Sequence, residues 1–427
     1  MIEIREDRKI NLPKDWKWVK LGEACKIVSG NTPKGLELIS NKGEYQFYKV
    51  SDMNLAGNET RMTVSNLKLS LEEVTKLKLK LYPKGTVIFP KRGGAILTNK
   101  KRILSQDASF DLNVMGILPN DKLASNFLFY WIQKLDLSKI YDGSNVPQIN
   151  NKNVDPLNFP LAPLATQQAI VSKIEELFSE LDKGIENLRT AQQQLKTYRQ
   201  AVLKWAFEGR LTNEHIKDGI LPKGWQITNL GDFIENISSG KSYRCNERPP
   251  NEDEVGIVKV SSVTWGFFDE MQSKTCFSND FLNIKYLIKQ EDFLFSRANT
   301  LEFIGACVIV KNIEKTLMLS DKILRFVFSN DVSKEYVLYY LRSKKGRKQI
   351  ETLSTGNQDS MRNIGQEKIR NIKFPYCSLN EQKRIVQEIE SRLSVADKME
   401  ESITQSLQQS EGLRQSILKK AFEGKLN

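Results

Sequence analysis

The chain has 427 residues, with 64 Lys and Arg against 52 Asp and Glu, so its formal net charge is +12. At roughly 100–200 residues per domain, this length predicts two to four domains that each bury a core, which excludes a disordered tail protein. No window approaches the ~18 apolar residues that span a bilayer, and residues 1–8 are too charged for a signal peptide. We therefore expect a cytoplasmic protein with no membrane contact.

Cysteine and histidine are too sparse for most metal or nucleophile chemistry. The five cysteines are widely spaced and form no C-x-x-C pair, so we expect buried free thiols instead of a disulfide framework or a zinc site. His215 is the only histidine and follows a polar stretch. A metal site with two imidazoles is therefore excluded, and a Ser-His-Asp triad is a remote alternative.

The first element along the chain is a variable segment, residues 1–158, which reads as a mixed α/β domain. Residues 85–89 form a short β-rich run bounded by turn residues, and a helix is predicted around residues 126–132. The aromatic side chains of that helix suit a core better than a base-stacking platform.

A long helix follows in residues 159–212. Apolar residues recur at alternating spacings of four and three from Ile170 to Trp205, which is a heptad pattern. Pro163 is placed to open the helix and Gly209 to end it. About 43 residues make a rod of roughly 64 Å, and a rod of this kind more often packs on another helix than on its own domain.

The second half of the chain repeats this order. Residues 213–373 read as another α/β domain, with β-rich runs at 256–260 and 306–310 and a helix around 334–341. Residues 374–427 align without a gap to residues 159–212 at an offset of 215, and 23 of the 54 positions are identical. In this second helix, Ser378 and Glu381 have capping-box spacing and Gly424 would end the helix. Its weaker heptad positions are Ile385, Ile389, Ala396, Met399, Ile403, Leu413 and Ile417.

The positive charge is concentrated in the variable domains. Residues 1–158 carry +8 and residues 213–373 carry +3, whereas the two helical segments carry +1 and 0. This distribution suggests that the domains contact a polyanion and the helices contact protein.

Two kinds of polar loop recur in both domains and are the candidate DNA-contacting segments. One follows a strand (residues 90–94 and 296–299), and the other precedes the long helix (143–151 and 356–363). Arg pairs with guanine O6/N7 and Asn or Gln with adenine N6/N7, so these loops suit reading of the major groove, although an ordinary polar turn is the alternative for any single loop. The candidate DNA-binding residues are Lys49, Ser51, Lys91, Arg92, Asn145, Gln148 and Asn150 in the first domain, and Lys259, Ser261, Arg297, Asn299, Asn357, Gln358 and Arg362 in the second.

Enzyme motifs are incomplete. Residues 239–242, Ser-Gly-Lys-Ser, resemble the end of a phosphate loop, but Glu235 stands where the earlier glycine is required, so this segment is predicted to be a turn. No G-x-G-x-x-G motif is present. We expect no catalytic residue and no bound cofactor.

The chain closely resembles the specificity subunit of type I restriction-modification enzymes over essentially its whole length. The resemblance rests on Leu-Pro-x-x-Trp-x-x-x-x-Leu-Gly opening each domain, Phe-Pro leading to Gln-x-x-Ile at each helix start, and Ala-Phe-Glu-Gly-Lys/Arg-Leu at each helix end. These motifs stand at residues 12–22 and 221–231, 159–170 and 374–385, and 206–211 and 421–426. Thr166, where the family usually has Glu, and Cys377-Ser378, where it often has Pro, depart from the pattern.

The resemblance implies that each variable domain is a target recognition domain reading one half of a bipartite, asymmetric DNA site. It also implies an antiparallel helix pair with pseudo-two-fold symmetry, which sets half-site spacing at about one DNA turn, ~34–36 Å, and docks two methyltransferase subunits. S-adenosylmethionine would belong to those subunits, and ATP and Mg²⁺ to a motor-nuclease subunit, the further partner. Two alternatives remain: a coiled-coil scaffold with protein-binding domains, and a self-contained DNA-modifying enzyme.

Overall fold

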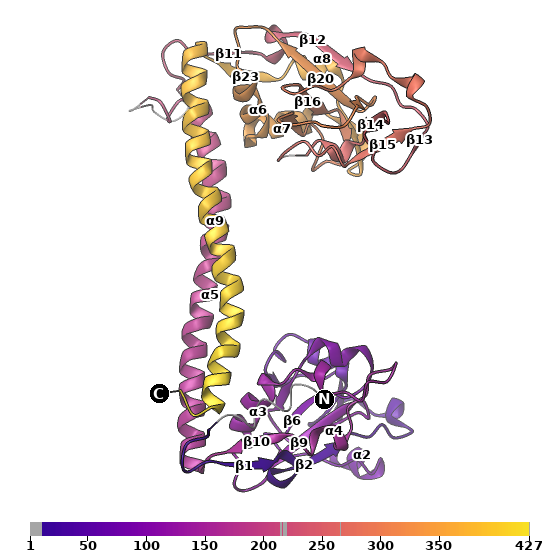
Figure 1. The fold of residues 1–427 in the computed structure, drawn as a ribbon, viewed down its shortest axis with the longest axis vertical. Helices are drawn as coiled ribbons and strands as arrows, with labels where there is room; N and C mark the ends of the chain where they lie inside the picture. Colours follow the sequence, from indigo (N-terminus) through magenta and orange to yellow (C-terminus); the bar gives the residue numbers. More distant parts are fainter. Residues whose placement is uncertain (1–10, 214–215, 217–219, 265, 427) are drawn as a thin grey trace. The chain divides into compact units, whose positions relative to one another are not determined.

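The structure, a computed structural model, describes residues 11–213, 216, 220–264 and 266–426. It contains two compact units, which are treated separately below (Figure 1). Unit 1 comprises Met1–Leu188 and Gln405–Asn427, and unit 2 comprises Arg189–Thr404. The charged N-terminus considered as a leader and the single histidine, His215, lie outside the described residues.

The globular domain of unit 1 contains a five-stranded sheet in the order β2-β9-β6-β7-β4, a three-stranded sheet in the order β5-β3-β8, and the pair β1-β10. Helix α3 (Ser125–Lys134) contributes Phe127, Phe129 and Trp131 to the core, as the sequence predicted. The strands are β1 (Lys17–Lys20), β2 (Cys25–Ser29), β3 (Tyr45–Tyr48), β4 (Arg61–Met62), β5 (Leu67–Leu69), β6 (Val87–Pro90), β7 (Arg102–Leu104), β8 (Ala108–Phe110), β9 (Val114–Pro119) and β10 (Asn158–Leu161); the short helices are α1 (Leu21–Ala24), η3 (Leu36–Leu38), η4 (Val50–Asn54), α2 (Leu71–Lys76), η5 (Gly93–Thr98), η6 (Leu137–Lys139) and α4 (Asn151–Val154).

The globular domain of unit 2 has the same general plan. Its sheets run β12-β20-β16-β18 and β13-β15-β14-β19, with a three-stranded sheet β17-β22-β21 and the pair β11-β23. The strands are β11 (Gln226–Asn229), β12 (Ile234–Ser239), β13 (Cys245–Asn246), β14 (Gly256–Val258), β15 (Ser273–Cys276), β16 (Phe293–Ser296), β17 (Ala298–Asn299), β18 (Cys307–Ile309), β19 (Leu317–Met318), β20 (Ile323–Phe328), β21 (Thr355–Gln358), β22 (Met361–Asn363) and β23 (Lys373–Tyr376); the helices are η7 (Leu230–Phe233), η8 (Val260–Ser262), η9 (Asn279–Phe281), η10 (Ile284–Tyr286), α6 (Lys334–Arg342), α7 (Lys344–Leu353) and α8 (Gln366–Arg370).

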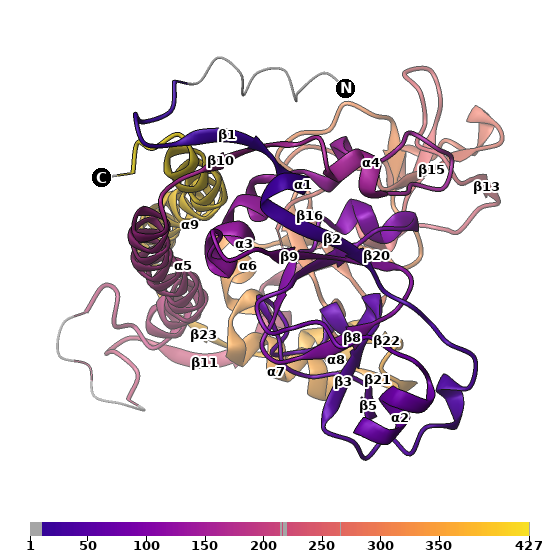
Figure 2. The same ribbon diagram turned by 90° about the horizontal axis from the view of Figure 1, so that it is seen from below.

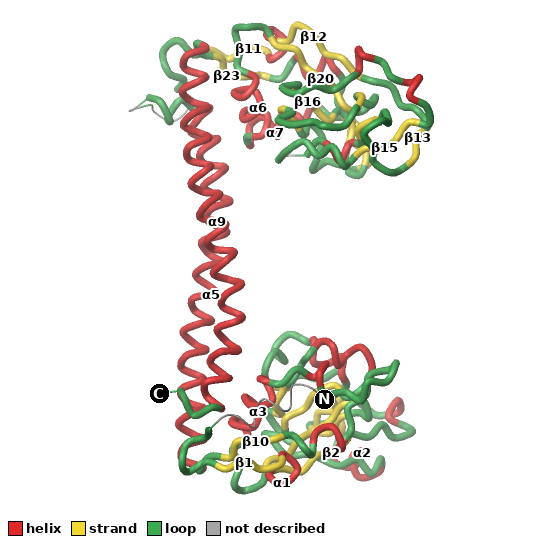
Figure 3. The backbone as a smooth tube through the Cα atoms, viewed as in Figure 1, coloured by secondary structure: helices red, strands yellow, loops and turns green. Residues whose placement is uncertain are grey.

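The two long helices are α5 (Leu164–Phe207) and α9 (Leu379–Phe422), each of 44 residues (Figure 3). Unit 1 contains the start of α5 with the end of α9, and unit 2 contains the end of α5 with the start of α9. In unit 1, Arg414 pairs with Asp182 and lies 4.3 Å from the ring centre of Phe178. In unit 2, Arg199 pairs with Asp397 and Glu400 at 2.5 and 2.8 Å. The predicted antiparallel packing of the helices is confirmed.

The heptad assignment in α9 is partly wrong. Met399 and Leu413, predicted to face α5, are 52% and 51% exposed. Glu400 and Arg414, one residue further along, reach α5 instead. Ala396 and Ile417 of the same assignment are buried, so the prediction fails at these two positions and not along the whole helix.

The ends of the long helices complete the cores of the globular domains. In unit 1, Phe422 of α9 packs against Phe127 of α3 with ring centres 5.0 Å apart. In unit 2, Phe207 of α5 packs against Tyr336 of α6 at 5.1 Å. Figure 2 shows the ribbons of both long helices seen nearly end-on beside these helices. A domain boundary at residue 158 falls inside β10, which pairs with β1.

The repeated motifs at the domain starts and helix ends contact each other. Gly209 and Gly424 follow α5 and α9 with φ of +77° and +68°, so both terminate their helices as predicted. A Cβ on Gly209 would lie 2.2 Å from Cγ of Pro222, and a Cβ on Gly424 would lie 2.2 Å from Cγ of Pro13. Glycine is therefore required at both positions by conformation and by space.

All five cysteines are free thiols, and four are buried, but Cys245 is only half-buried, contrary to expectation. Within the described residues, no cluster of three or more His, Cys, Asp or Glu side chains could hold a metal ion. None of the helices described is both long and apolar enough to cross a membrane.

Candidate nucleic-acid interface

The recurrent polar loops of unit 1 meet at one end of the five-stranded sheet. Strands β2 and β6 both run antiparallel to β9, so they finish at the same sheet edge, with Ser29 opposite Met115 and Pro90 opposite Val114. Lys91 Nζ donates to Ser29 Oγ at 2.7 Å. We call this surface, residues 29–32, 90–94 and 143–150, edge 1.

Backbone hydrogen bonds join the two loops of edge 1. Gly93 N donates to the carbonyl oxygen of Pro147 at 2.8 Å, and Ile149 N donates to that of Lys91 at 2.9 Å. Arg92 and Gln148 form an isolated antiparallel bridge between these bonds. The loop after the strand and the loop before the helix, which are distant in sequence, therefore form one surface.

Unit 2 brings the equivalent loops together in the same way. Strands β12 and β16 flank β20, with Ser239 opposite Leu324 and Ser296 opposite Ile323. The following strand β17 pairs with β22, which places Asn299 opposite Arg362. We call residues 239–242, 296–299, 320–322 and 355–363 edge 2.

The repeat extends upstream of residue 159 into these loops. Ile149 and Ile364, which the offset of the repeat relates to each other, are both fully buried. The next residue in each unit, Asn150 or Gly365, is the N-cap of a short helix, α4 or α8. The structure therefore places the two polar loops in register where the sequences differ too much for alignment.

The candidate residues of edge 1 have different environments. Arg92 and Asn145 are exposed, and Gln148 is half-buried. Burial lowers the pKa of Lys91, with a smaller contribution from the charge of Arg92. The Asn150 side chain accepts a hydrogen bond from Lys152 N at 3.1 Å and so caps α4, and its contact with DNA stays a prediction.

Lys49 lies directly before η4 and Ser51 lies within it, and both are exposed. Asp111 links Lys49 to edge 1, because its carboxylate interacts electrostatically with Lys49 and with Lys91. Burial is the main reason that the pKa of Asp111 is raised.

Lys259 and Ser261 occupy the equivalent place in unit 2, around η8. Lys259 Nζ pairs with Glu247 at 3.3 Å, and Ser261 Oγ donates to Gln272 at 3.0 Å. Neither contact reaches edge 2, so the structure does not bring these two residues together with Arg297 and Asn299.

Arg362 holds the hairpin of edge 2 in shape. Its guanidinium donates to the carbonyl oxygens of Ser354 and Gly356, both at 3.0 Å, and to Ser354 Oγ at 3.1 Å. Gly356 has φ of +141° and leaves no room for a Cβ beside Met361. Arg362 therefore positions the hairpin, and a base contact would cost it these bonds.

The other candidates of edge 2 lie around this hairpin. Arg297 is half-buried, and its carbonyl oxygen accepts from Ile364 N at 2.9 Å. Asn299 Nδ2 donates to Ser296 Oγ at 3.3 Å, and Gln358 is exposed. Asn357 belongs to β21, but its side chain lies outside what the structure describes.

Two cations of edge 2, Lys241 and Lys322, are missing from the sequence-based candidates. Arg297 N donates to the carbonyl oxygen of Lys322 at 2.9 Å, so Lys322 lies beside Arg297. Gly240 N donates to the carbonyl oxygen of Ser320 at 3.2 Å, so Lys241 lies on the other side of the start of β20, because β20 lies between β12 and β16. Both lysines are exposed. The signal available in the sequence is the Ser-Gly pair at residues 239–240, which was predicted only as a turn; neither Gly240 nor Gly30, in the matching pair at residues 29–30, has room for a Cβ.

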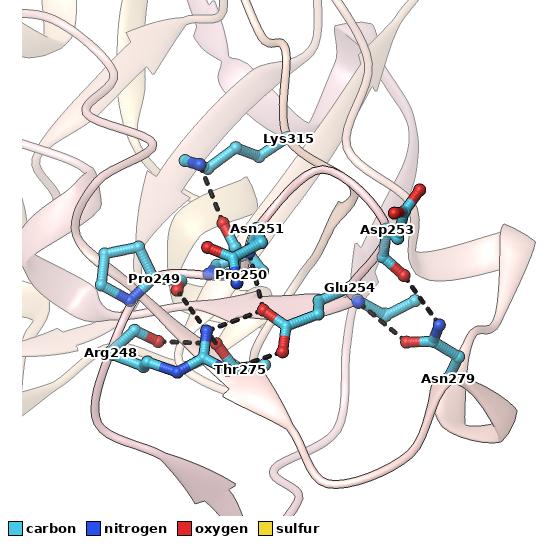
Figure 4. A network of polar contacts seen from close by, with 10 residues as sticks. Arg248, Pro249, Pro250, Asn251, Asp253, Glu254, Thr275, Asn279 and Lys315 are labelled. Atoms are coloured by element: carbon cyan, nitrogen blue, oxygen red, sulfur yellow. Dashed lines mark hydrogen bonds and ion pairs between the residues drawn. The ribbon is translucent and has the colours of Figure 1, made fainter.

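A polar network anchors the chain that leads away from Lys241 (Figure 4). Arg248 forms a two-pronged ion pair with Glu254, at 2.7 and 2.6 Å, and this pairing lowers the pKa of Glu254 to about 2. Thr275 Oγ1 of β15 donates to the carbonyl oxygen of Arg248 at 2.8 Å. The segment that includes β13 is therefore fixed to the sheet.

Comparisons with known proteins agree with this architecture. Residues 13–189 and 222–409 each match the family described as type I restriction modification DNA specificity domain. The chain is 24% identical over 425 residues to the type I restriction enzyme EcoKI specificity subunit of Escherichia coli (strain K12), covering 97% of this chain and 90% of that one. It is also 24% identical over 441 residues to the MjaVIII specificity subunit of Methanocaldococcus jannaschii, covering 99% and 95%.

Solved structures share the fold. The crystal structure of the HsdS subunit from Thermoanaerobacter tengcongensis superposes with a TM-score of 0.63 at 18% identity, covering 98% of this chain and 99% of that chain. A chain from a structure described as the basis of complex assembly and conformational transition of the type I R-M system gives 0.71 at 19% identity, covering 97% and 99%.

Proposed function

Because the chain belongs to the type I restriction modification DNA specificity family, we propose that it reads a bipartite, asymmetric site in double-stranded DNA, one half with each unit. The observation that carries the proposal is the paired edge: in each unit, two polar loops distant in sequence join beside a sheet end that presents lysine and arginine. Arginine and amide side chains on fixed loops match the donors and acceptors of the major groove. The two edges differ in sequence, so the two half-sites differ.

The proposal includes a non-catalytic role and partner subunits. Methyltransferase subunits, two of them, dock on α5 and α9, and a motor-nuclease subunit is a further partner. S-adenosylmethionine, ATP and Mg²⁺ act on those partners. The near-neutral charge of the helical segments, +1 and 0, supports a protein partner for the helices.

Mapping methylated motifs in cells with and without this chain tests the proposal. The expected result is a two-part motif that disappears with the chain. Exchange of residues 221–373 for the equivalent domain of another member should change one half of the motif only. A motif that changes in both halves, or methyl transfer by the purified chain alone, would contradict the proposed role.

The proposal assigns half-site spacing to the length of α5 and α9. Arg199 pairs with Asp397 within unit 2, so residues 192–198 lie opposite 398–404 in the antiparallel register. Deleting both heptads shortens the helices by about 10 Å and should shorten the gap in the methylated motif by about three base pairs. An unchanged gap would refute this assignment.

A salt series separates DNA reading from a purely structural scaffold with protein-binding domains. Phosphate contacts predict that log K against log[salt] for duplex binding slopes at about −0.9 per phosphate neutralised. A flat dependence would favour the scaffold.

A further inference from the structure

Each edge presents one large apolar side chain at the same position of the repeat. Val146 in edge 1 is 69% exposed, and Met361, its counterpart in edge 2, is 71% exposed. A single exposed apolar residue is ordinary on a protein surface. Because these two apolar residues stand at the same position of the repeat, on edges that otherwise differ in sequence, we expect both edges to use an apolar contact.

The backbone that carries each apolar side chain is fixed. The carbonyl oxygen of Val146 accepts from Ser144 Oγ at 2.6 Å, and the next carbonyl, of Pro147, accepts from Gly93 N. Met361 opens β22, whose hairpin is held by the guanidinium of Arg362. Both side chains are therefore presented on ordered loops, which reduces the entropy lost when a ligand binds.

An amide side chain lies two positions after each apolar one. Gln148 follows Val146, and Asn363 follows Met361, so the amides also occupy equivalent positions of the repeat. Alternate residues of a strand share a face, so Met361 and Asn363 lie on the face of β22 opposite Arg362. Within the described part of the chain, neither amide side chain makes a hydrogen bond, because the bonds recorded for Gln148 and Asn363 use backbone atoms.

One kind of base pair is complementary to an apolar group beside a free amide. In the major groove, an A·T pair offers the thymine C5-methyl group, and adenine offers an N7 acceptor with an N6 donor. We propose that Val146 with Gln148, and Met361 with Asn363, each read one A·T pair, the apolar side chain contacting the thymine methyl and the amide pairing with adenine N6 and N7. This inference rests on the proposed function and assigns one base pair of each half-site.

The test uses the full chain and duplexes that carry the mapped motif. Replacing one thymine at a time by deoxyuridine removes only the methyl group, and one position per half-site should weaken binding about fourfold, the worth of one buried methyl. Replacing the paired adenine by 7-deazaadenine removes the N7 acceptor and should weaken binding roughly fivefold. Deoxyuridine between the half-sites should leave affinity unchanged.

Variants connect each position to its residue. Met361→Ala should abolish the deoxyuridine effect in one half-site and leave the other intact, and Val146→Ala should do the reverse. Leu38→Ala, which shortens a side chain of η3 that is 83% exposed and is not one of the residues of edge 1, is the matched control and should change neither effect. Gln148→Leu and Asn363→Leu should abolish the 7-deazaadenine effect in their half-sites.

The outcomes distinguish failure of this inference from failure of the proposed function. No binding of the motif by the chain, alone or with its methyltransferase subunits, would contradict the proposed function. Three other results would overturn the inference and leave the proposed function standing. They are specific binding with no deoxyuridine effect in either half-site, a half-site without thymine, and a deoxyuridine effect that survives both alanine variants.

Discussion

Gln167 and Gln382 occupy the same position of the repeat, and these two fully buried amides make equivalent sets of hydrogen bonds. Each side chain joins the first turn of its long helix to the loop that precedes α3 or α6. Gln167 donates to the carbonyl oxygens of Ala162 and Lys122, at 2.8 and 2.9 Å, and accepts from Ala124 N at 2.8 Å. Gln382 donates to the carbonyl oxygens of Cys377 and Asp331, at 2.8 and 3.4 Å, and accepts from Ser333 N at 2.9 Å.

Gln382→Ala should lower the free energy of unfolding of unit 2 by about 2–4 kcal/mol, because it leaves buried backbone groups without partners. Hydrogen exchange resolved by segment measures the effect in unit 2 and its absence in unit 1. Gln387→Ala, on an exposed face of the same helix, is the control and should change stability by less than about 0.5 kcal/mol. Equal effects of the two variants would contradict the assigned role of Gln382.

Arg362→Gln should loosen the hairpin of edge 2, because several guanidinium bonds to its backbone are lost. Amide exchange in residues 355–363 should become at least tenfold faster, and affinity for the second half-site should fall. Arg297→Gln should lower the same affinity without changing the exchange rates. Unchanged exchange in Arg362→Gln would mean that Arg362 does not position the hairpin.

Lys241→Gln and Lys322→Gln should each reduce the magnitude of the salt slope of duplex binding by about 0.9, the value for one phosphate contact. Both lysines are exposed at edge 2, and a lysine that contacts a phosphate contributes equally whatever the base sequence. Lys398→Gln removes an equal charge from an exposed position of α9 and serves as the control. A slope that Lys398→Gln changes equally would place the DNA elsewhere.

Stability of unit 2 should fall between pH 9 and pH 11 because of Cys307. Burial raises the pKa of this thiol from its ordinary value of 9 to about 11. In this range the unfolded chain loses the proton while the folded chain keeps it, so stability that is complete below pH 9 is lost as pH rises. The contribution of Cys307 is roughly 2–3 kcal/mol. Burial also raises the pKa of Cys276 and of Cys377 to about 12, so Cys307→Ala should reduce the loss of stability by this contribution and leave the rest, as denaturant titrations at pH 9 and pH 11 would show. Ile309→Val in the same strand should lower stability equally at both.

Phe422→Ala should destabilise unit 1, and Phe207→Ala should destabilise unit 2, each by about 3–5 kcal/mol. The reason is that each ring completes a core formed by another part of the sequence, Phe422 against Phe127 and Phe207 against Tyr336. Segment-resolved hydrogen exchange distinguishes the two results. Faster exchange in unit 2 after Phe422→Ala would contradict the assignment.

Periodicity and repetition were enough to predict the long helices and their ends, whereas their antiparallel packing was implied by the resemblance to the specificity subunits. The constant offset of the repeat reveals the second helix. Gly209 and Gly424 mark the helix ends, because helices commonly end at a glycine in the left-handed conformation. The face of α9 at Met399 and Leu413 was not predictable from a strict heptad, because the ion pairs that turn Glu400 and Arg414 toward α5 depend on the register of the packed helices.

The sequence predicted which loops form the candidate sites but not the role of each residue in them. Residue type alone makes both Arg92 and Arg362 candidates for DNA contact. Only the structure shows that Arg92 is exposed, whereas Arg362 donates hydrogen bonds to Ser354 and Gly356. Lys241 and Lys322 were missed because only the pairing of β12 and β16 with β20 brings the segments that carry them to the same sheet edge as Arg297.

The packing of Phe422 against Phe127 also affects the order in which the chain acquires structure during synthesis. Unit 1 includes residues 405–426, so its N-terminal part, up to Leu188, leaves the ribosome with part of its core uncovered. Unit 2, Arg189–Thr404, is contiguous and can close first. The half of the protein that is translated first is therefore the half that finishes folding last.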